Sequence, residues 1–287
     1  MGCRLERSRQ WATRCMHEAQ LHDKNVFITL TFNDENLNDQ GSLQKQDFQN
    51  FIKRLRKYYY SDKFKKKYPN YHQGKIRYFH CGEYGDKFSR PHHHACLFNC
   101  DFPDKELLKK NKTGDNLYTS KILTDLWAEQ GHCYIGDVIF ESAAYVARYC
   151  TKKITGKKAD EYYSGRQPEY MTCSKKPAIG KEWLDRYLSD VFPHDEIIMR
   201  GKKMRVNRYY EKYLEKLDPE MLTSVKINRE EKDYLDDAAR RIREYEVQQL
   251  RQKTITRSYE QQSKYSLDTY DQDSLEYLKR FNNKENL

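Results

Sequence analysis

Hydrophobic and polar positions recur along the chain with periods that predict short strands and amphipathic helices. Strands are expected where β-branched and aromatic residues concentrate: 26–32, 75–83, 90–98, 131–140 and, as a strand or a hairpin around Gly201, 197–206. Helices are expected at 4–22, 43–60, 118–130, 141–153, 181–189, 208–217 and 227–251. Loops are expected at 104–116 and 154–180. This order predicts an α+β fold, an antiparallel sheet backed by helices of the ferredoxin-like kind, with additional helices at the N- and C-terminal ends.

Charge is unevenly distributed along the 287 residues. The net charge is +10, but the segment from 226 to the end holds 13 basic and 13 acidic side chains, so the whole excess lies in 1–225. We expect a basic domain over 1–225, a charged helical extension over 226–251 and a polar, poorly packed tail over 252–287. Basic charge interleaved with 24 tyrosines suits a single-stranded nucleic acid, because cations follow phosphates while rings stack on bases.

Composition narrows the class of protein. No run approaches 18 consecutive apolar residues and no signal peptide heads the chain, so a soluble, unsecreted protein without a membrane partner is expected. Eight cysteines are scattered without a C-x-x-C pair, which favours reduced thiols over a disulfide framework.

Three consecutive histidines at the start of the 90–98 strand are the main candidate site. Side chains alternate along a strand, so His92 and His94 share one face, about 6–7 Å apart, and His93 points to the other. If the strand pairs in a hairpin with Glu83 opposite His92, the carboxylate joins the histidine face. Two imidazoles and a carboxylate suit Mg²⁺ or Mn²⁺ better than a structural zinc. The alternative is a hydrogen-bonded histidine cluster without a metal.

Two tyrosines lie four residues apart on the 141–153 helix, so Tyr145 and Tyr149 emerge from one face. Such a pair often only packs, but here Arg148, Lys152 and Lys153 supply cations that could favour a phenolate and hold phosphates. A tyrosine that attacks a phosphodiester needs a metal to polarise the phosphoryl oxygens, and the histidine hairpin offers one.

Two further basic stretches stay open between two interpretations. The 4–22 helix carries four arginines beside Leu5, Trp11, Cys15, Met16 and Ala19, and is either a solvated helix or a DNA-contacting one. The basic-aromatic stretch 53–68 is either a DNA-binding surface or a soluble connection. The DNA-contacting candidates outside the tyrosine helix are Arg54, Arg56, Lys57 and Arg90.

These motifs resemble those of the HUH endonucleases. Pro91-His-His-His-Ala-Cys-Leu-Phe98 is similar to their His-hydrophobic-His signature, with a polar His93 in the middle position, and Tyr145-Val-Ala-Arg-Tyr-Cys-Thr-Lys-Lys153 is similar to their two-tyrosine motif. More closely, the chain resembles the replication initiators of the gokushovirus branch of the microviruses. The matching stretches are Cys3-Arg-Leu-Glu-Arg-Ser-Arg-Gln-Trp-Ala12, Gly82-Glu-Tyr-Gly-Asp86, Ser142-Ala-Ala-Tyr-Val-Ala-Arg-Tyr149 and Pro177-Ala-Ile-Gly-Lys-Glu-Trp183.

The resemblance implies a site-specific nicking enzyme that initiates rolling-circle replication of phage DNA. His92 and His94, with Glu83, would hold Mg²⁺ or Mn²⁺. Tyr145 or Tyr149 would attack the origin phosphodiester, leaving a 3′-OH for synthesis and a 5′-phosphotyrosine, and the released strand would later be rejoined. The expected electrostatic helper is Lys152, followed by Lys153 and Arg148.

The implied partners are single-stranded DNA at the phage origin, a host helicase and the replication machinery, and the implied location is the host bacterial cytoplasm. Three alternatives remain: a plasmid relaxase or single-strand transposase with the same chemistry, a non-catalytic single-stranded DNA-binding protein, and a structural-metal protein.

Overall fold

The computed structural model describes residues 2–71, 74–111, 114–154 and 156–282; the side chains of 2–4, of 149–152 and, Ser258 and Glu276 apart, of 255–282 lie outside this description. The chain divides into two compact units, residues 1–218 and 219–287. The second unit contains one long helix, α10 (Pro219–Asn282). This helix includes residues 252–282 of the predicted polar tail, while the predicted division at 225 stays a prediction.

Among the described residues of unit 1, seven strands form one antiparallel sheet in the order β4-β5-β6-β1-β3-β2-β7. Their bounds are β1 (Asn25–Thr31), β2 (Arg77–Tyr84), β3 (Pro91–Phe98), β4 (Glu106–Lys110), β5 (Asn116–Thr119), β6 (Cys133–Asp137) and β7 (Tyr170–Cys173). With α2 (Lys45–Tyr59) and α4 (Lys121–Leu126), strands β1, β2, β3 and β6 follow the order β-α-β-β-α-β. The α+β prediction is confirmed.

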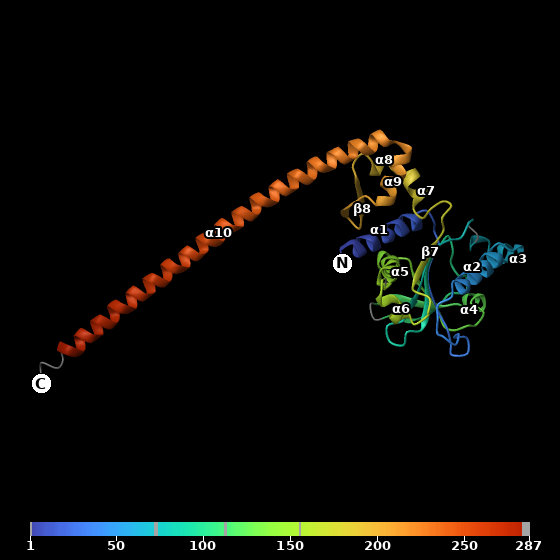
Figure 1. Cartoon of the computed structure of the whole chain (residues 1–287), viewed down its shortest axis with the longest axis horizontal. Helices are drawn as coiled ribbons and strands as arrows, with labels where there is room; N and C mark the ends of the chain where they lie inside the picture. The colour runs from blue at the N-terminus through green and yellow to red at the C-terminus, as the bar shows by residue number, and fades with distance from the viewer. Residues whose placement is uncertain (1, 72–73, 112–113, 155, 283–287) are drawn as a thin grey trace. The chain divides into compact units, whose positions relative to one another are not determined.

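One face of the sheet is covered by α2 and α4 (Figure 1). Alternation in β1 points Ile28 and Leu30 to this face, where they join a buried cluster. Helix α2 contributes the four side chains predicted to point inward, and all four are buried: Phe48, Phe51, Ile52 and Leu55. Trp127, just after α4, is fully buried in the same cluster.

The opposite face is covered by α1 (Gly2–Ala19) and α5 (Phe140–Lys152), which lie against each other (Figure 1). Ala12 and Cys15 of α1 are fully buried together with Phe79 of β2 and Val146 of α5. The helix α1 is therefore a packing element over part of its length rather than a wholly solvated helix. Leu5, on the predicted apolar stripe, is 62% exposed.

Two predicted loops contain strands. The 104–116 loop holds β4 and the start of β5; the apolar residues of β4, Leu107 and Leu108, are both exposed, so the edge strand has no alternating pattern. The 154–180 loop holds α6 (Lys158–Tyr163) and β7, each too short to show a period. The helix predicted at 118–130 is shorter in the structure, where α4 ends at Leu126. It begins after Ser120, whose side chain caps the helix by accepting the Leu123 N–H at 3.0 Å.

The remaining elements are α3 (Asp62–Lys67), the 3₁₀ turn η1 (Pro69–Tyr71), α7 (Lys181–Arg186), α8 (Leu188–Val191), the hairpin β8 (Glu196–Met199) and β9 (Lys202–Arg205), and α9 (Arg208–Leu217). The hairpin around Gly201 is therefore confirmed. Cys15, Cys96, Cys100, Cys133 and Cys173 are free thiols, as expected. No helix in the described part of the chain is long and apolar enough to cross a membrane.

Candidate active site

The β2–β3 hairpin places the histidines and the carboxylate as the sequence predicts. In the antiparallel register Glu83 lies opposite His92, and Cys81 lies opposite His94. The turn closes when the Gly85 N–H donates to the Arg90 carbonyl at 2.9 Å. A Cβ at Gly85 would come within 2.9 Å of His92 Cε1, so this glycine leaves the space that the imidazole occupies.

Glu83 and His94 contact each other directly. Glu83 Oε1 lies 2.8 Å from His94 Nε2, and Thr29 Oγ1 of β1 lies 3.0 Å from His94 Nδ1. Both side chains are nearly buried, with 4% of the Glu83 side chain and 7% of the His94 side chain exposed. Glu83 Oε2 is buried without a hydrogen-bond partner among the described atoms. A buried carboxylate oxygen without a partner is unfavourable unless something else binds it.

His92 presents one nitrogen to the site. Its Nδ1 lies 2.8 Å from the Arg90 carbonyl, which only accepts, so Nδ1 carries the proton and Nε2 holds the lone pair in the neutral ring. Burial lowers the pKa of His92, and the nearby His94 adds to this, so the ring is neutral at pH 7. The rings of His92 and His94 lie 6.3 Å apart and nearly parallel. Neutral imidazoles are the form that binds metals.

The donor atoms show which residues could hold a metal ion. No group of three or more His, Cys, Asp and Glu side chains in the described residues is already arranged to hold a metal ion. Two imidazole nitrogens and a carboxylate on one face of the β2–β3 hairpin nevertheless match the donors that Mg²⁺ and Mn²⁺ accept in proteins, and the buried Oε2 of Glu83 needs a partner. The residues fit a divalent ion, provided that it replaces the contact between Glu83 and His94.

Tyr145 reaches this cluster from α5. The helix begins where Ser142 Oγ accepts the Ile139 N–H at 2.9 Å, and its buried Ala143 and Val146 hold it against the sheet. The Tyr145 ring then packs edge-on against His94, with ring centroids 5.1 Å apart. The backbone of Tyr149 and Lys152 continues α5, but their side chains lie outside the described ones. Arg148 and Lys153 are exposed on or beside the same helix.

His93 points to the other face, as predicted, and is fully buried there. Its Nδ1 lies 3.1 Å from Nε2 of His80, a β2 residue that sequence reasoning missed, and His80 Nδ1 lies 2.9 Å from Thr172 Oγ1 of β7. Burial, with His94 and His92 nearby, lowers the pKa of His93 to about 3. Thr29 was also missed, and only the pairing of β1 with β3 reveals it.

The remaining DNA-contacting candidates do not gather at the histidine face. Arg54 and Arg56 belong to α2, which covers the opposite face, and they donate to the carbonyls of Leu126 at 2.7 Å and Ile76 at 3.1 Å. Lys57 is exposed on the same helix. Arg90 forms an ion pair with Asp34 beside the hairpin.

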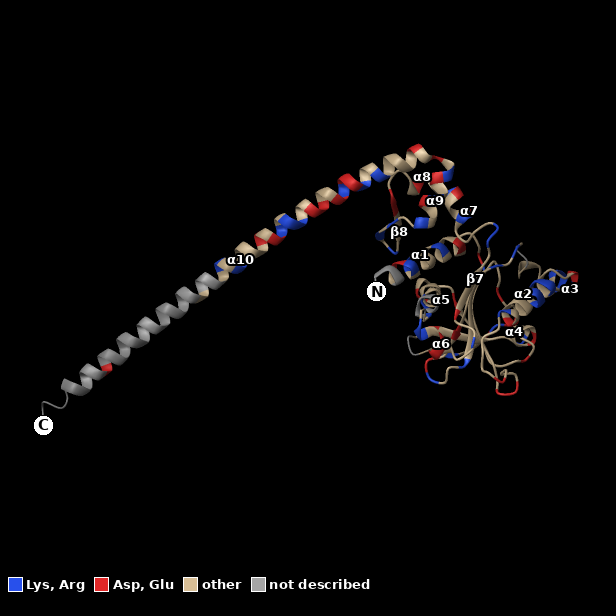
Figure 2. Cartoon of the chain, in the orientation of Figure 1, with Lys and Arg blue, Asp and Glu red and all other residues tan. Residues whose placement is uncertain are grey.

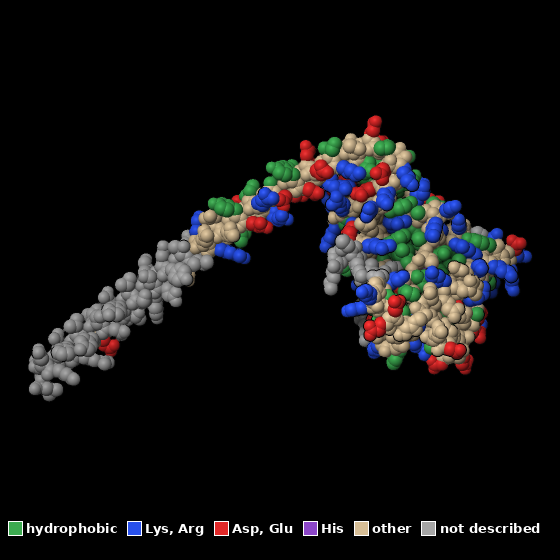
Figure 3. Space-filling view, in the orientation of Figure 1, with side chains coloured by type: hydrophobic (Ala, Val, Ile, Leu, Met, Phe, Trp, Pro, Cys, Tyr) green, Lys and Arg blue, Asp and Glu red, His purple; other side chains and the backbone are tan. Residues whose placement is uncertain are grey.

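Cations do gather around α1 and the β8–β9 hairpin, where Lys and Arg are prominent in Figures 2 and 3. Arg9 of α1 donates to the Arg205 carbonyl at 3.3 Å, and Lys202, Lys203, Arg205 and Arg208 are exposed. Sequence reasoning singled out none of the hairpin cations.

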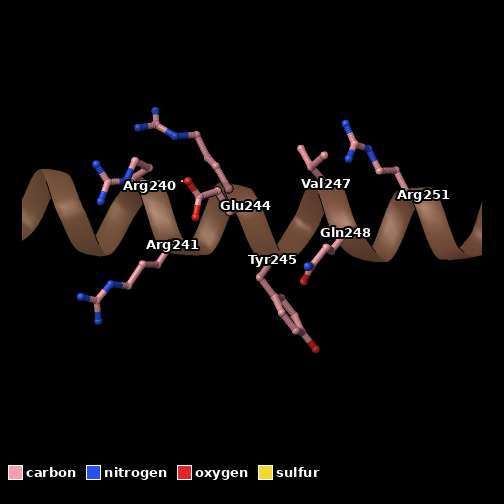
Figure 4. A pocket seen from close by; sticks show the side chains of 8 residues that line it. Arg240, Arg241, Glu244, Tyr245, Val247, Gln248 and Arg251 are labelled. Carbon is pink, nitrogen blue, oxygen red and sulfur yellow. Dashed lines mark ion pairs between the residues drawn. The ribbon is translucent and has the colours of Figure 1, made fainter.

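A separate hollow runs along α10 and is lined by eight residues of that helix, among them Arg240, Arg241, Arg251 and Tyr245 (Figure 4). The labelled side chains extend in different directions from one helix, so the hollow is the space between neighbouring side chains of an exposed element. It does not have the form of a binding site.

Comparison with known proteins identifies the family. Residues 25–154 match the family described as "Replication-associated protein ORF2/G2P". The chain is 37% identical over 250 residues to the replication-associated protein VP4 of Bdellovibrio phage phiMH2K, covering 83% of this chain and 76% of that protein. It is 33% identical over 227 residues to the replication-associated protein ORF2 of Spiroplasma virus 4, covering 75% of this chain and 66% of that protein.

A third relative, the replication-associated protein ORF4 of Chlamydia phage 1, is 31% identical over 221 residues, covering 75% of this chain and 52% of that protein. No solved structure matches the chain. The chain belongs to the family of replication-associated proteins of microviruses, so the recognition from its motifs is confirmed.

Proposed function

We propose that this protein initiates phage DNA replication by nicking one strand at the origin and later rejoining it. The observation that carries the proposal is the contact of Tyr145 with His94, beside a buried carboxylate oxygen of Glu83 that has no hydrogen-bond partner among the described residues. The names of the relatives support a role in replication. Single-stranded DNA would be the substrate, a host helicase and replication proteins the partners, and the host bacterial cytoplasm the location.

In this proposal His92, His94 and Glu83 would hold a divalent ion, Mg²⁺ or Mn²⁺. When bound, the ion supplies Lewis-acid polarisation of the scissile phosphate. The phenol oxygen of Tyr145 or Tyr149 attacks phosphorus and loses its proton. The bond from phosphorus to the 3′ oxygen breaks, and the departing oxygen takes up a proton to become the 3′-OH.

The 5′ phosphate remains esterified to the tyrosine, so the number of phosphodiester bonds is conserved. In the reverse reaction a 3′-OH attacks the phosphotyrosine, the new DNA linkage forms and the tyrosine regains its proton. Lys152, Lys153 and Arg148 would hold the phosphates near α5 by charge. Two tyrosines on one helix would permit two successive strand transfers.

The test uses labelled single-stranded oligonucleotides tiled across the genome that encodes the chain, with Mn²⁺. Wild type should form a denaturant-resistant protein–DNA adduct on one oligonucleotide, and Tyr145→Phe/Tyr149→Phe should form none. Each single variant then shows whether the remaining tyrosine alone can form the adduct. Tyr162→Phe, an exposed tyrosine outside α5, is the control and should keep the adduct. Absence of an adduct in wild type, with metal present, would favour the alternative of a non-catalytic single-stranded DNA-binding protein.

A further inference from the structure

A cavity of about 380 Å³ opens beside the candidate active site. His94 and Tyr145 belong to its lining, so it adjoins the place where the proposed scissile phosphate lies. Its floor is the sheet: the β6–β1–β3 pairing aligns Tyr134, Thr29 and His94 in one row across the strands. Its walls are α5 on one side and the end of the β4–β5 hairpin on the other.

The floor is open because of a glycine. Gly136 of β6 lies opposite Phe27 of β1, and both line the cavity. A Cβ at Gly136 would approach the Phe27 ring only to 3.8 Å, an ordinary van der Waals contact. The backbone therefore tolerates a side chain here, and a branched one would occupy space that is now part of the cavity.

Carboxylates dominate the polar rim. Asp115, Asp137 and Glu141 line the cavity together with the cation Arg148, and Glu141 also forms an ion pair with Arg200. Asp115 is held in place by Asn111: Asn111 Nδ2 donates to Asp115 Oδ2 at 2.9 Å, and the Asp115 backbone N–H donates to Asn111 Oδ1 at 2.8 Å. In a chain whose net charge is +10, the carboxylates of Asp115 and Asp137 beside the cavity disfavour a phosphate and favour a group that donates hydrogen bonds.

The size and the aromatic lining of the cavity narrow the class of ligand further. Small-molecule sites span about 300–1,000 Å³, and this cavity lies at the lower end. The rings of Phe27 and Tyr134 offer faces or edges to a planar ligand. Stacking of a base on an aromatic side chain contributes about 1–3 kcal/mol. Carboxylates, in turn, accept hydrogen bonds from the exocyclic amines of bases.

We propose that this cavity receives one unstacked nucleobase from the nucleotide next to the scissile phosphate, and that its carboxylate rim prefers a base with an exocyclic amine over thymine. The inference rests on the proposed function for the position of that nucleotide, but not for the binding itself. The cavity would therefore contribute to the choice of nicking site.

The first experiment measures binding by fluorescence anisotropy in EDTA, with the tightest-binding oligonucleotide of the tiled set and a series of single abasic substitutions. For wild type, one abasic position should weaken binding by about 5- to 150-fold, the equivalent of 1–3 kcal/mol. Gly136→Val, which fills the cavity, should bind the intact oligonucleotide more weakly than wild type does. Its affinity should no longer change when that position is made abasic. Gly136→Ala is the matched control and should stay close to wild type.

The second experiment places each of the four bases at the sensitive position. Thymine should bind most weakly to wild type, and Asp115→Asn should reduce that difference. Equal binding of all four bases would overturn the preference for an exocyclic amine. If wild type nicks but Gly136→Val is as sensitive as wild type to every abasic position, the cavity is not a base site, while the proposed function stands.

One outcome is that wild type is sensitive to one abasic position, that Gly136→Val loses this sensitivity, and that wild type never forms an adduct. This outcome would support base binding and reject the nicking reaction. A sensitive position far from the mapped nick would overturn the placement next to the scissile phosphate. The two proposals can therefore fail separately.

Discussion

The buried ion pair between Glu18 of α1 and Arg77 of β2 holds the N-terminal helix against the sheet. No more than 3% of either side chain is exposed. Glu18 Oε2 also accepts the Gly180 N–H at 2.7 Å, and Arg77 Nη2 donates to the Pro177 carbonyl at 2.9 Å. We predict that Glu18→Gln destabilises unit 1 strongly, because it leaves the Arg77 charge buried without its counterion.

The size of the effect follows from burial. Burial alone would raise the pKa of Glu18, but the nearby His22 and the hydrogen bonds from Arg77 and the Gly180 N–H outweigh it, so the pKa lies below its usual value and the carboxylate is charged at pH 7. Removing one partner of a buried pair costs about 3–5 kcal/mol. At about 2–4 °C per kcal/mol, the melting temperature should fall by roughly 6–20 °C.

The assay is urea unfolding at pH 7, followed by tryptophan fluorescence. All three tryptophans, Trp11, Trp127 and Trp183, belong to unit 1, so the signal reports this unit alone. The matched control is Glu6→Gln on the same helix, where the carboxylate is 47% exposed and pairs with Arg9. Exposed pairs contribute about 0–1 kcal/mol, so this variant should unfold almost like wild type.

Two results would refute the reasoning. A loss below about 1 kcal/mol in Glu18→Gln would mean that the Arg77 charge finds another partner or water. The double variant Glu18→Gln/Arg77→Met should be more stable than Glu18→Gln, because the unpaired charge is gone. If the double variant loses the sum of the single losses, the two residues are not coupled.

Three further predictions concern pH, packing and metal. Burial lowers the pKa of His17 to about 3, while a histidine in the unfolded chain titrates near 6.5. The contribution of His17 to the free energy of unfolding is therefore complete above about pH 6.5 and is lost toward pH 3. Between pH 7 and pH 5 the loss should be about 2 kcal/mol. His17→Gln should flatten this slope in urea titrations. Phe79→Ala, which removes a fully buried ring stacked on Trp11, should cost about 3–5 kcal/mol in the same assay. Mn²⁺ at about 100 times its Kd should stabilise wild type by about 2.7 kcal/mol in thermal unfolding, but should not stabilise Glu83→Gln.

Controls separate these effects from general damage. Gln20→Ala removes the hydrogen bond to Trp183, which stacks on His17, and should lower stability equally at both pH values. An unchanged pH slope in His17→Gln would contradict the first prediction. A loss below 1 kcal/mol in Phe79→Ala would show that the site collapses around the missing ring. Equal stabilisation of wild type and Glu83→Gln by Mn²⁺ would place the ion elsewhere.

Much of the candidate site follows from local geometry that a sequence carries. Strand alternation alone separates His92 and His94 from His93, and the paired hairpin puts Glu83 opposite His92. The apolar period of the α2 segment correctly predicts four of its buried side chains and misses the fifth, Tyr59. In each case the relevant residues are close in sequence, so a repeating backbone period fixes their relative directions.

Elements without a period were missed. Strands β4 and β7 are short and lie at the two edges of the sheet, where one neighbouring strand supplies their pairing and little alternation is needed. The roles of Arg54 and Arg56 also depended on which face α2 covers, since both donate to backbone carbonyls there. A basic stretch has the same composition whether its cations bind phosphates or anchor a helix.

By itself, the sequence determined the motifs, the two faces of the histidine strand and the family to which the chain belongs. Tertiary structure decided that Tyr145 packs on His94, about 50 positions earlier in the chain, that Glu18 pairs with Arg77, and that a cavity opens between α5 and the β4–β5 hairpin. The physical reason is that a local period fixes directions within one element. Distances between elements depend on how their buried surfaces pack together, which no single segment specifies.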